Sequence, residues 1–148
     1  MLGFQNFMKK EIDNKTTTHA MRIFSASRSR LIMCRFQTTK AWTVPSVIAE
    51  PGRDPYEKML SYLFDKFYGF ENVVSIVFLD QDVRTIKTTK GYDELTTNLY
   101  DVELDSNVVP AVFEPFDIVR WTPVDMIKSE QMINNATAAV RKMMEKEK

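Results

Sequence analysis

Apolar residues alternate with polar ones in some stretches of the chain and recur at helical spacing in others, which predicts a mixed α/β domain. Alternating or continuously apolar runs bounded by turn residues predict strands over residues 17–25, 30–37, 41–49, 72–80, 83–88, 98–105 and 116–121. The first two strands are expected to form a hairpin through the turn at 25–29. Residues 1–16 are expected to form an N-terminal extension with a short amphipathic helix over residues 1–13. Residues 17–148 are expected to form one domain.

Two of the predicted strands also carry a burial pattern. Residues 72–80 are almost continuously apolar, which favours a strand buried on both faces, ended by a turn at Gln81-Asp82. Residues 98–105 alternate between acidic and apolar positions, which predicts an edge strand with a charged outer face.

A helix is predicted over residues 55–68, and its start is well marked. Asp54 suits the N-cap, Pro55 takes the first helical position, and Glu57 completes a capping box. Gly69 is expected to end the helix. Its broad apolar face consists of Tyr56, Met59, Leu60, Leu63, Phe64 and Phe67.

Two further helix starts lie near the end of the chain. Thr122 precedes Pro123 as a cap, and Ser129 is expected to cap a final helix. The face of that final helix carries Met132, Ile133, Ala136, Val140, Met143 and Met144. This stripe predicts a core contact, and a groove for a partner is the alternative.

The stretch 41–70 resembles the signature of the Nudix hydrolases: a Trp-x-x-Pro strand, a Glu-Pro-Gly loop and a helix carrying Arg-Glu-x-x-Glu-Glu. The chain matches the frame of this signature at Trp42, Pro45, Glu50, Pro51, Gly52, Pro55 and Gly69. The passage 119–125 also resembles the closing strand-to-helix passage of Nudix domains. The resemblance implies a single-domain α/β/α sandwich with a mixed sheet.

Most acidic residues of this Nudix box are replaced. Its first Glu corresponds to Arg53, its Arg-Glu pair to Ser61-Tyr62 and its Glu-Glu pair to Asp65-Lys66. Metal-assisted hydrolysis of a phosphoanhydride needs several carboxylates that converge on Mg²⁺ or Mn²⁺. We therefore expect a domain with a degenerate box, no catalytic residues and no metal cofactor. Such a domain acts as a binding or interaction module for a nucleotide, RNA or protein.

A divergent Nudix hydrolase of a nucleoside diphosphate derivative is the alternative. Its Mg²⁺ or Mn²⁺ ligands would be Glu50, Glu57, Asp65 and acids of the segment 93–105. Glu57 and Asp65 are about 12 Å apart along the helix, at roughly 1.5 Å per residue, which is too far to share one ion.

For the binding module, the expected ligand contacts are Arg35, Trp42, Arg53 and Lys66, because Arg53 and Lys66 can meet an anion directly. The competing expectation, which the loss of the box acids favours, is that Tyr62, Phe64 or Tyr68 fills the cleft and that the protein acts through an outer surface. The sequence predicts no oligomeric state.

The net charge is zero, but it is unevenly distributed. Residues 1–40 hold eight Lys or Arg against two acids, and residues 41–105 hold six against twelve. The basic side chains of the predicted hairpin are Arg22, Arg28, Arg30 and Arg35. They indicate either a patch for nucleic acid or charges neutralised within the fold.

The remaining composition excludes several classes of protein. Cys34 and His19 are the only residues of their kinds, which rules out an intrachain disulfide and a histidine-rich metal site. Cys34 lies in an apolar run and is expected to be a buried thiol. No apolar run is long enough to span a membrane. We expect an intracellular, cytoplasmic protein, with organelle targeting as the alternative.

Overall fold

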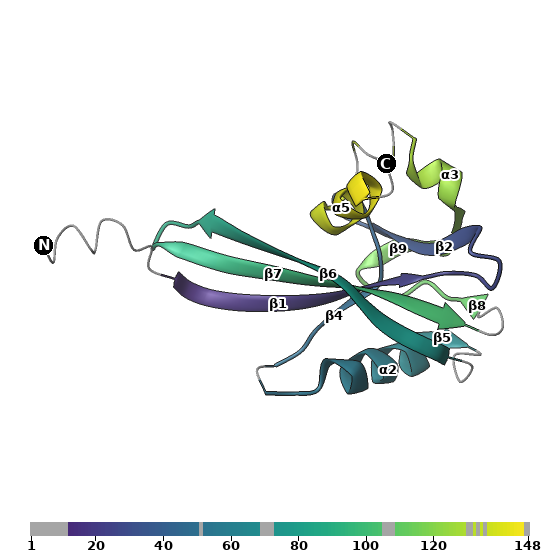
Figure 1. Ribbon diagram of the computed structural model, residues 1–148. Coiled ribbons are helices and arrows are strands. Elements are labelled where there is room, and N and C mark those ends of the chain that lie inside the picture. Colours follow the sequence, from purple (N-terminus) through teal and green to yellow (C-terminus); the bar gives the residue numbers. More distant parts are fainter. Residues whose placement is uncertain are drawn as a thin grey trace, which may run out of the picture.

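A four-stranded mixed sheet forms the centre of the computed structural model (Figure 1), which describes residues 12–50, 52–68, 73–104, 109–129, 132, 134 and 136–146. The strand order of this sheet is β4 (Ser46–Ile48), β1 (Ile12–Ile23), β7 (Tyr92–Leu104) and β6 (Val73–Lys87). β1 and β7 are parallel, and the other two pairs are antiparallel.

Two smaller sheets and the helices complete the fold. An antiparallel sheet has the order β3 (Trp42–Thr43), β2 (Arg30–Phe36) and β9 (Phe116–Pro123), and β5 (Phe67–Tyr68) pairs with β8 (Val109–Pro110). The helices are α2 (Pro55–Lys66), α3 (Val124–Ile127) and α5 (Ala138–Lys146). In Figure 1, α2 lies on one side of the central sheet, and α3 and α5 lie on the other.

Alternate residues of the strands face two separate apolar cores. Met21 of β1 and Ile32 of β2 belong to the core that includes α2. Ala20 and Met33, their neighbours along the same strands, belong to the core that includes Val140 of α5. This two-sided packing confirms the predicted α/β/α sandwich with a mixed sheet in one compact domain. No helix among the described residues is long and apolar enough to cross a membrane.

The start of α2 is as predicted. Its first residue is Pro55, and the Asp54 carboxylate accepts a hydrogen bond from the Tyr56 N–H at 3.0 Å. The helix ends at Lys66, two residues earlier than predicted, because Phe67 is extended and opens β5. Gly69, the expected stop, lies outside the described residues.

The apolar face of α2 is narrower than predicted. Met59 and Leu63 are fully buried, whereas Tyr56, Leu60 and Phe64 are 41%, 36% and 59% exposed. The predicted apolar face is therefore buried only in part, at Met59, Leu63 and Phe67.

The predicted hairpin of the first two strands was wrong. β1 joins the central sheet and β2 joins the antiparallel one. One isolated bridge, Phe24 with Leu31, links the chain segments next to the turn. The physical reason is that both edges of β1 have other partners: β7 pairs with one edge from Ile12 to Ile23, and β4 pairs with the other at Thr18, His19 and Ala20.

The strand predicted over residues 41–49 is split at Pro45, which has no N–H for a ladder. β3 pairs with β2 before this point, and β4 pairs with β1 after it. The segment therefore crosses from one sheet to the other and delivers Glu50 to the start of α2.

The turn predicted at Gln81-Asp82 is absent, because β6 continues through it to Lys87. The pairing of β6 with β7 shifts register between Phe78 and Asp80, where the apolar run of β6 gives way to polar residues. β6 lies at the edge of the central sheet, so Val77 and Phe78 are about half exposed and not buried on both faces as predicted. The acidic strand predicted as an edge is β7, which instead lies between β1 and β6.

The predicted starts of the C-terminal helices are confirmed in part. Thr122 is a buried residue of β9, and the short helix α3 starts at Val124 without a side-chain cap. The Ser129 hydroxyl accepts a hydrogen bond from the Met132 N–H at 3.3 Å, as predicted for a cap, and Met132 and Asn134 are helical. The final helix is not continuous, because Ala136 and Thr137 are non-helical and α5 starts at Ala138. The predicted core contact is confirmed for the buried side chains Met132, Ala136, Val140 and Met143.

The beginning of the chain lies mainly outside the described residues. The helix predicted there can be compared only at Ile12 and Asp13, which belong to β1. β1 thus begins five residues before the predicted strand and pairs with β7 from its first residue.

Candidate functional site

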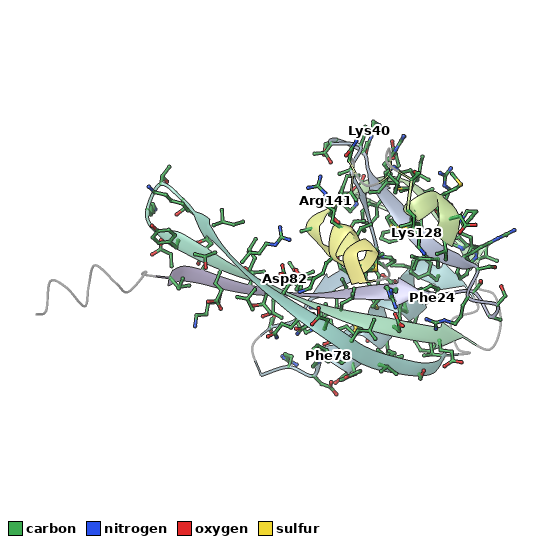
Figure 2. The ribbon with its side chains drawn as sticks, turned by 45° about the horizontal axis from the view of Figure 1, so that its top comes forward. Phe24, Lys40, Phe78, Asp82, Lys128 and Arg141 are labelled. Atoms are coloured by element: carbon green, nitrogen blue, oxygen red, sulfur yellow. The ribbon has the colours of Figure 1, made fainter. Side chains whose placement is uncertain are left out.

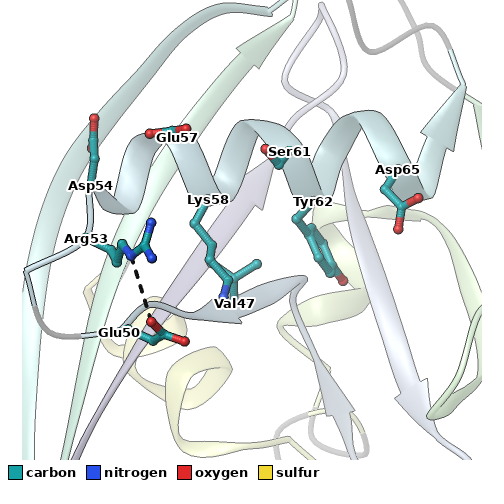
Figure 3. A pocket seen from close by; sticks show the side chains of 9 residues that line it. All are labelled: Val47, Glu50, Arg53, Asp54, Glu57, Lys58, Ser61, Tyr62 and Asp65. Carbon is teal, nitrogen blue, oxygen red and sulfur yellow. Dashed lines mark ion pairs between the residues drawn. The ribbon is translucent and has the colours of Figure 1, made fainter.

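A cavity of about 550 Å³ opens between α2 and the chain that follows β4 (Figure 3). This volume lies within the range of roughly 300 to 1,000 Å³ that is usual for small-molecule sites. Its lining consists of Val47, Glu50, Arg53, Asp54, Glu57, Lys58, Ser61, Tyr62 and Asp65. We call this cavity the α2 groove.

Local sequence explains how the groove is built. Lys58, Ser61 and Asp65 are three or four residues apart, so their side chains follow one face of α2. The opposite wall turns back at Gly52, whose φ of 81° is readily adopted only by glycine. The Arg53 N–H then donates to the Glu50 carbonyl oxygen at 3.0 Å and closes the turn.

Two carboxylates of the groove are already close to cations. Arg53 Nε lies 3.8 Å from a Glu50 carboxylate oxygen, and both side chains are largely exposed. Lys66 Nζ lies 3.1 Å from the Asp65 carboxylate. These exposed pairs contribute little stability, but they place positive charge beside the acids.

The comparisons with known proteins rest on structure, because no protein-family model and no curated protein sequence matches this chain. The MutT NUDIX hydrolase from Burkholderia pseudomallei matches with a TM-score of 0.65 and 13% identity, over 90% of this chain and 98% of that one. The NUDIX domain of Shewanella oneidensis NrtR, complexed with ADP ribose, matches with a TM-score of 0.64 and 11% identity, over 99% and 97%. The chain has the Nudix fold.

A longer protein also contains this fold. The chain matches 43% of the length of a bifunctional NMN adenylyltransferase/ADP ribose pyrophosphatase from Francisella tularensis, with a TM-score of 0.62 and 11% identity over 95% of this chain. Identities this low establish the Nudix fold and no particular activity.

The donor set on α2 does not fit the metal ions that the Nudix fold implies. Divalent cations of this class are held by several carboxylates at about 2.0 to 2.6 Å. Glu57 and Asp65 are two turns apart on α2, and Ser61 lies between them (Figure 3). In the part of the chain that the structure describes, no three His, Cys, Asp or Glu side chains form a group that could hold a metal ion.

Tyr62 forms an aromatic wall of the groove without filling it. Its ring packs edge-on against Phe67 and Phe113, with centroids 6.4 and 5.8 Å away. Burial raises the pKa of the phenol, so the side chain stays neutral and can only donate or accept hydrogen bonds. The competing expectation of a filled cleft is wrong for Tyr62, which lines the cavity, and for Phe64, which does not line it. The side chain of Tyr68 lies outside the described residues.

The structure separates the residues predicted to contact a ligand. Of these, Arg53 lines the α2 groove, together with the alternative metal ligands Glu50, Glu57 and Asp65. Lys66 lines a neighbouring cavity of about 260 Å³, where its amine lies 5.3 Å from the Phe113 ring centroid.

Arg35 and Trp42 are paired neighbours in β2 and β3 and do not line the groove. Lys58 does line it and was missed by the sequence reasoning. Its position one turn after Asp54, on the stripe that leads to Ser61, could have identified it.

Most basic side chains near β1 and β2 are neutralised within the fold. Arg22 donates to the Asp101 carboxylate at 2.9 Å, and Arg28 lies 3.3 Å from the same group. Arg35 lies 2.8 Å from Asp117. Of the four arginines that the sequence suggested as a nucleic-acid patch, only Arg30 is exposed and forms no ion pair with a described residue.

Cys34 and His19 are core residues. Burial raises the pKa of the Cys34 thiol to about 12, so it remains protonated and unreactive. His19 Nδ1 and the Tyr100 hydroxyl are hydrogen-bonded at 2.9 Å, and burial lowers the pKa of the imidazole. The predicted buried thiol is confirmed.

Asp117→Asn should reduce the loss of stability in acid. Hydrogen bonds from Arg35 and then Lys40 hold the pKa of Asp117 well below its ordinary value of 3.8. The stabilisation is present above that ordinary value and disappears as the pH falls toward the lower folded-state value. Between about pH 5 and pH 2, urea unfolding should show a steeper decline for the wild type than for the variant. Parallel declines would contradict this assignment.

Proposed function

We propose that this Nudix-fold domain is a binding module that has lost metal-dependent hydrolysis. The observation that supports this is the face of α2 that lines the groove. This face carries Ser61 and Tyr62 where the Nudix box that the sequence resembles carries Arg-Glu. It also carries a single carboxylate, Asp65, which lies beside the ammonium of Lys66. A hydroxyl, a phenol and one carboxylate bind a ligand by hydrogen bonds but do not assemble a divalent cation site.

The groove offers an anion two cations, beside the four carboxylates of its lining. Arg53 and Lys58 both line it, and guanidinium and ammonium groups bind phosphate or carboxylate oxygens directly. A nucleotide, an RNA phosphate or an acidic segment of a protein partner presents such oxygens. The open cavity leaves room for a ligand next to both cations.

A divergent hydrolase is the second candidate, and one observation favours it. Glu50, which precedes α2, and Glu57 and Asp65 of α2 line the same groove. If these side chains bound Mg²⁺ or Mn²⁺, they would have to approach one another and give up the contacts with Arg53 and Lys66.

Turnover assays separate the two functions. The protein should not hydrolyse a panel of nucleoside diphosphate derivatives with Mg²⁺ or Mn²⁺; the panel should include ADP ribose, which the NUDIX domain of Shewanella oneidensis NrtR binds in its complex. Glu57→Gln and Asp65→Asn serve as matched controls and should give the same background as the wild type. Metal-dependent hydrolysis that falls in either variant would support the hydrolase instead.

A further inference from the structure

The edge strand β6 exposes an unusual amount of apolar surface. Five of its large side chains, Val77, Phe78, Leu79, Val83 and Ile86, are between 39% and 53% exposed. β7 pairs with one side of β6, and no described strand pairs with the other. Edge strands of monomeric proteins are usually short or protected by charge, because an open edge can pair with another strand. This surface is therefore suited to a partner.

The outer half of β6 is also accessible. In Figure 1 the ends of β1, β6 and β7 nearest the N terminus project beyond the three helices. Figure 2 shows Phe78 and Asp82 successively along β6 on the way to this projecting end. α5 contacts β6 next to this end through Lys142, whose amine lies 3.2 Å from the Asp80 carboxylate and 2.9 Å from the Gln81 carbonyl oxygen.

The charges of this edge are self-complementary. In an antiparallel pair of two β6 strands centred on Val83, Asp82 of each copy lies opposite Arg84 of the other, and Gln81 lies opposite Thr85. Opposite charges directly across a strand pair stabilise it, and like charges destabilise it. The half-exposed Val83 side chains meet at the centre, so this register joins one apolar and two ionic contacts.

Interactions within the chain hold this segment ready for pairing. Arg84 Nε donates to the Asp82 carboxylate at 2.8 Å, so both charges already lie on the same face of the strand. Lys142 of α5 lies 3.4 Å from Asp82 and donates to the Gln81 carbonyl oxygen at 2.9 Å. A carbonyl oxygen has a second lone pair, so the Lys142 contact leaves an acceptor for the added strand.

We propose that two copies of the chain pair antiparallel through β6, with Val83 at the two-fold axis. The two central sheets then form one continuous sheet, and each α2 groove stays open because no groove residue belongs to β6. One strand pair is smaller than a standard interface of about 800 Å² per partner. The dimer is therefore reversible and forms as the concentration rises.

Sedimentation equilibrium of the full chain tests the dimer and its charges. The apparent mass should rise from 17.2 kDa toward twice that value with concentration. Arg84→Asp places a carboxylate opposite Asp82 at both ends of the two-fold pair and should weaken dimerisation about tenfold or more. The double variant Asp82→Arg with Arg84→Asp restores opposite charges across the pair and should dimerise like the wild type. Arg30→Asp, on the other sheet, is the control and should dimerise like the wild type. A monomer at all concentrations, or a dimer insensitive to Arg84→Asp, would overturn the proposal.

Cross-linking tests the register. Residues facing each other in an antiparallel pair have Cα atoms about 4.5 to 5.5 Å apart, which suits a disulfide. Oxidation of the Val83→Cys variant should therefore give a covalent dimer. The native Cys34 is buried and should not form an intermolecular disulfide. Lys87→Cys should not, because its two copies are about 26 Å apart at roughly 3.3 Å per residue. Equal cross-linking of both variants, or of neither, would overturn this register.

Discussion

Leu63→Ala should lower the free energy of unfolding by about 2 to 5 kcal/mol. Leu63 is fully buried and packs in the core between α2 and the central sheet, together with Met59 and Val102. Removing its three outer carbons loses apolar burial and leaves a cavity that rigid strands close only in part. Chemical denaturation of the purified protein measures the change.

Phe64→Ala is the matched control for this result. Phe64 is the next residue on α2 and is 59% exposed, so its truncation should cost less than about 1 kcal/mol. Similar losses for the two variants would show that the buried face of α2 is wrongly assigned.

Asp101→Ala should destabilise the fold by about 2 to 4 kcal/mol. Its carboxylate accepts from Arg22 and Arg28, and the side chains of Asp101 and Arg22 are only 17% and 11% exposed. Truncation leaves the Arg22 guanidinium poorly solvated and without its carboxylate. The expected loss is below that of a fully buried pair because water still reaches both groups.

Two variants separate this effect from a general weakening of β7. Glu103→Ala removes an exposed carboxylate from the same strand and should change stability by less than about 0.5 kcal/mol. The double variant Arg22→Met with Asp101→Leu should be more stable than Asp101→Ala alone, because it leaves no unpaired charge. A double variant as unstable as the single one would contradict the ion-pair explanation.

Local signals in the sequence predicted local structure well. The Asp54-Pro55 start of α2 is encoded by residues that act on their own neighbours, through a cap and a fixed φ. The Nudix-like frame of residues 41–70 also led to the right fold, because those residues shape the loop between β4 and α2. Of the frame residues, Glu50 lines the cavity and Trp42 does not.

Pairing between distant segments could not be predicted from the same signals. Residues 17–25 and 30–37 look like a hairpin locally, but the parallel pairing of β1 with β7 joins segments about 80 positions apart. The same distance separates Arg22 from Asp101 and Arg35 from Asp117, so the neutralisation of the basic residues was visible only as one of two alternatives.

The candidate site shows the same division. Ser61 and Tyr62 stand where the Nudix box that the sequence resembles carries Arg-Glu, and their positions on α2 place them in the groove. Arg35 and Trp42 were grouped with Arg53 by charge and motif alone. They belong to β2 and β3, whose pairing no local pattern specifies.

Calorimetric titration with Mg²⁺ and Mn²⁺ tests most directly whether the α2 groove has lost its metal chemistry. We predict no saturable binding at submillimolar metal, because Glu57 and Asp65 are too far apart to share an ion. The titration traces of the wild type and Asp65→Ala should be identical. Saturable binding by the wild type that disappears in Asp65→Ala would show that the groove acids do converge on a metal, and would contradict the central claim.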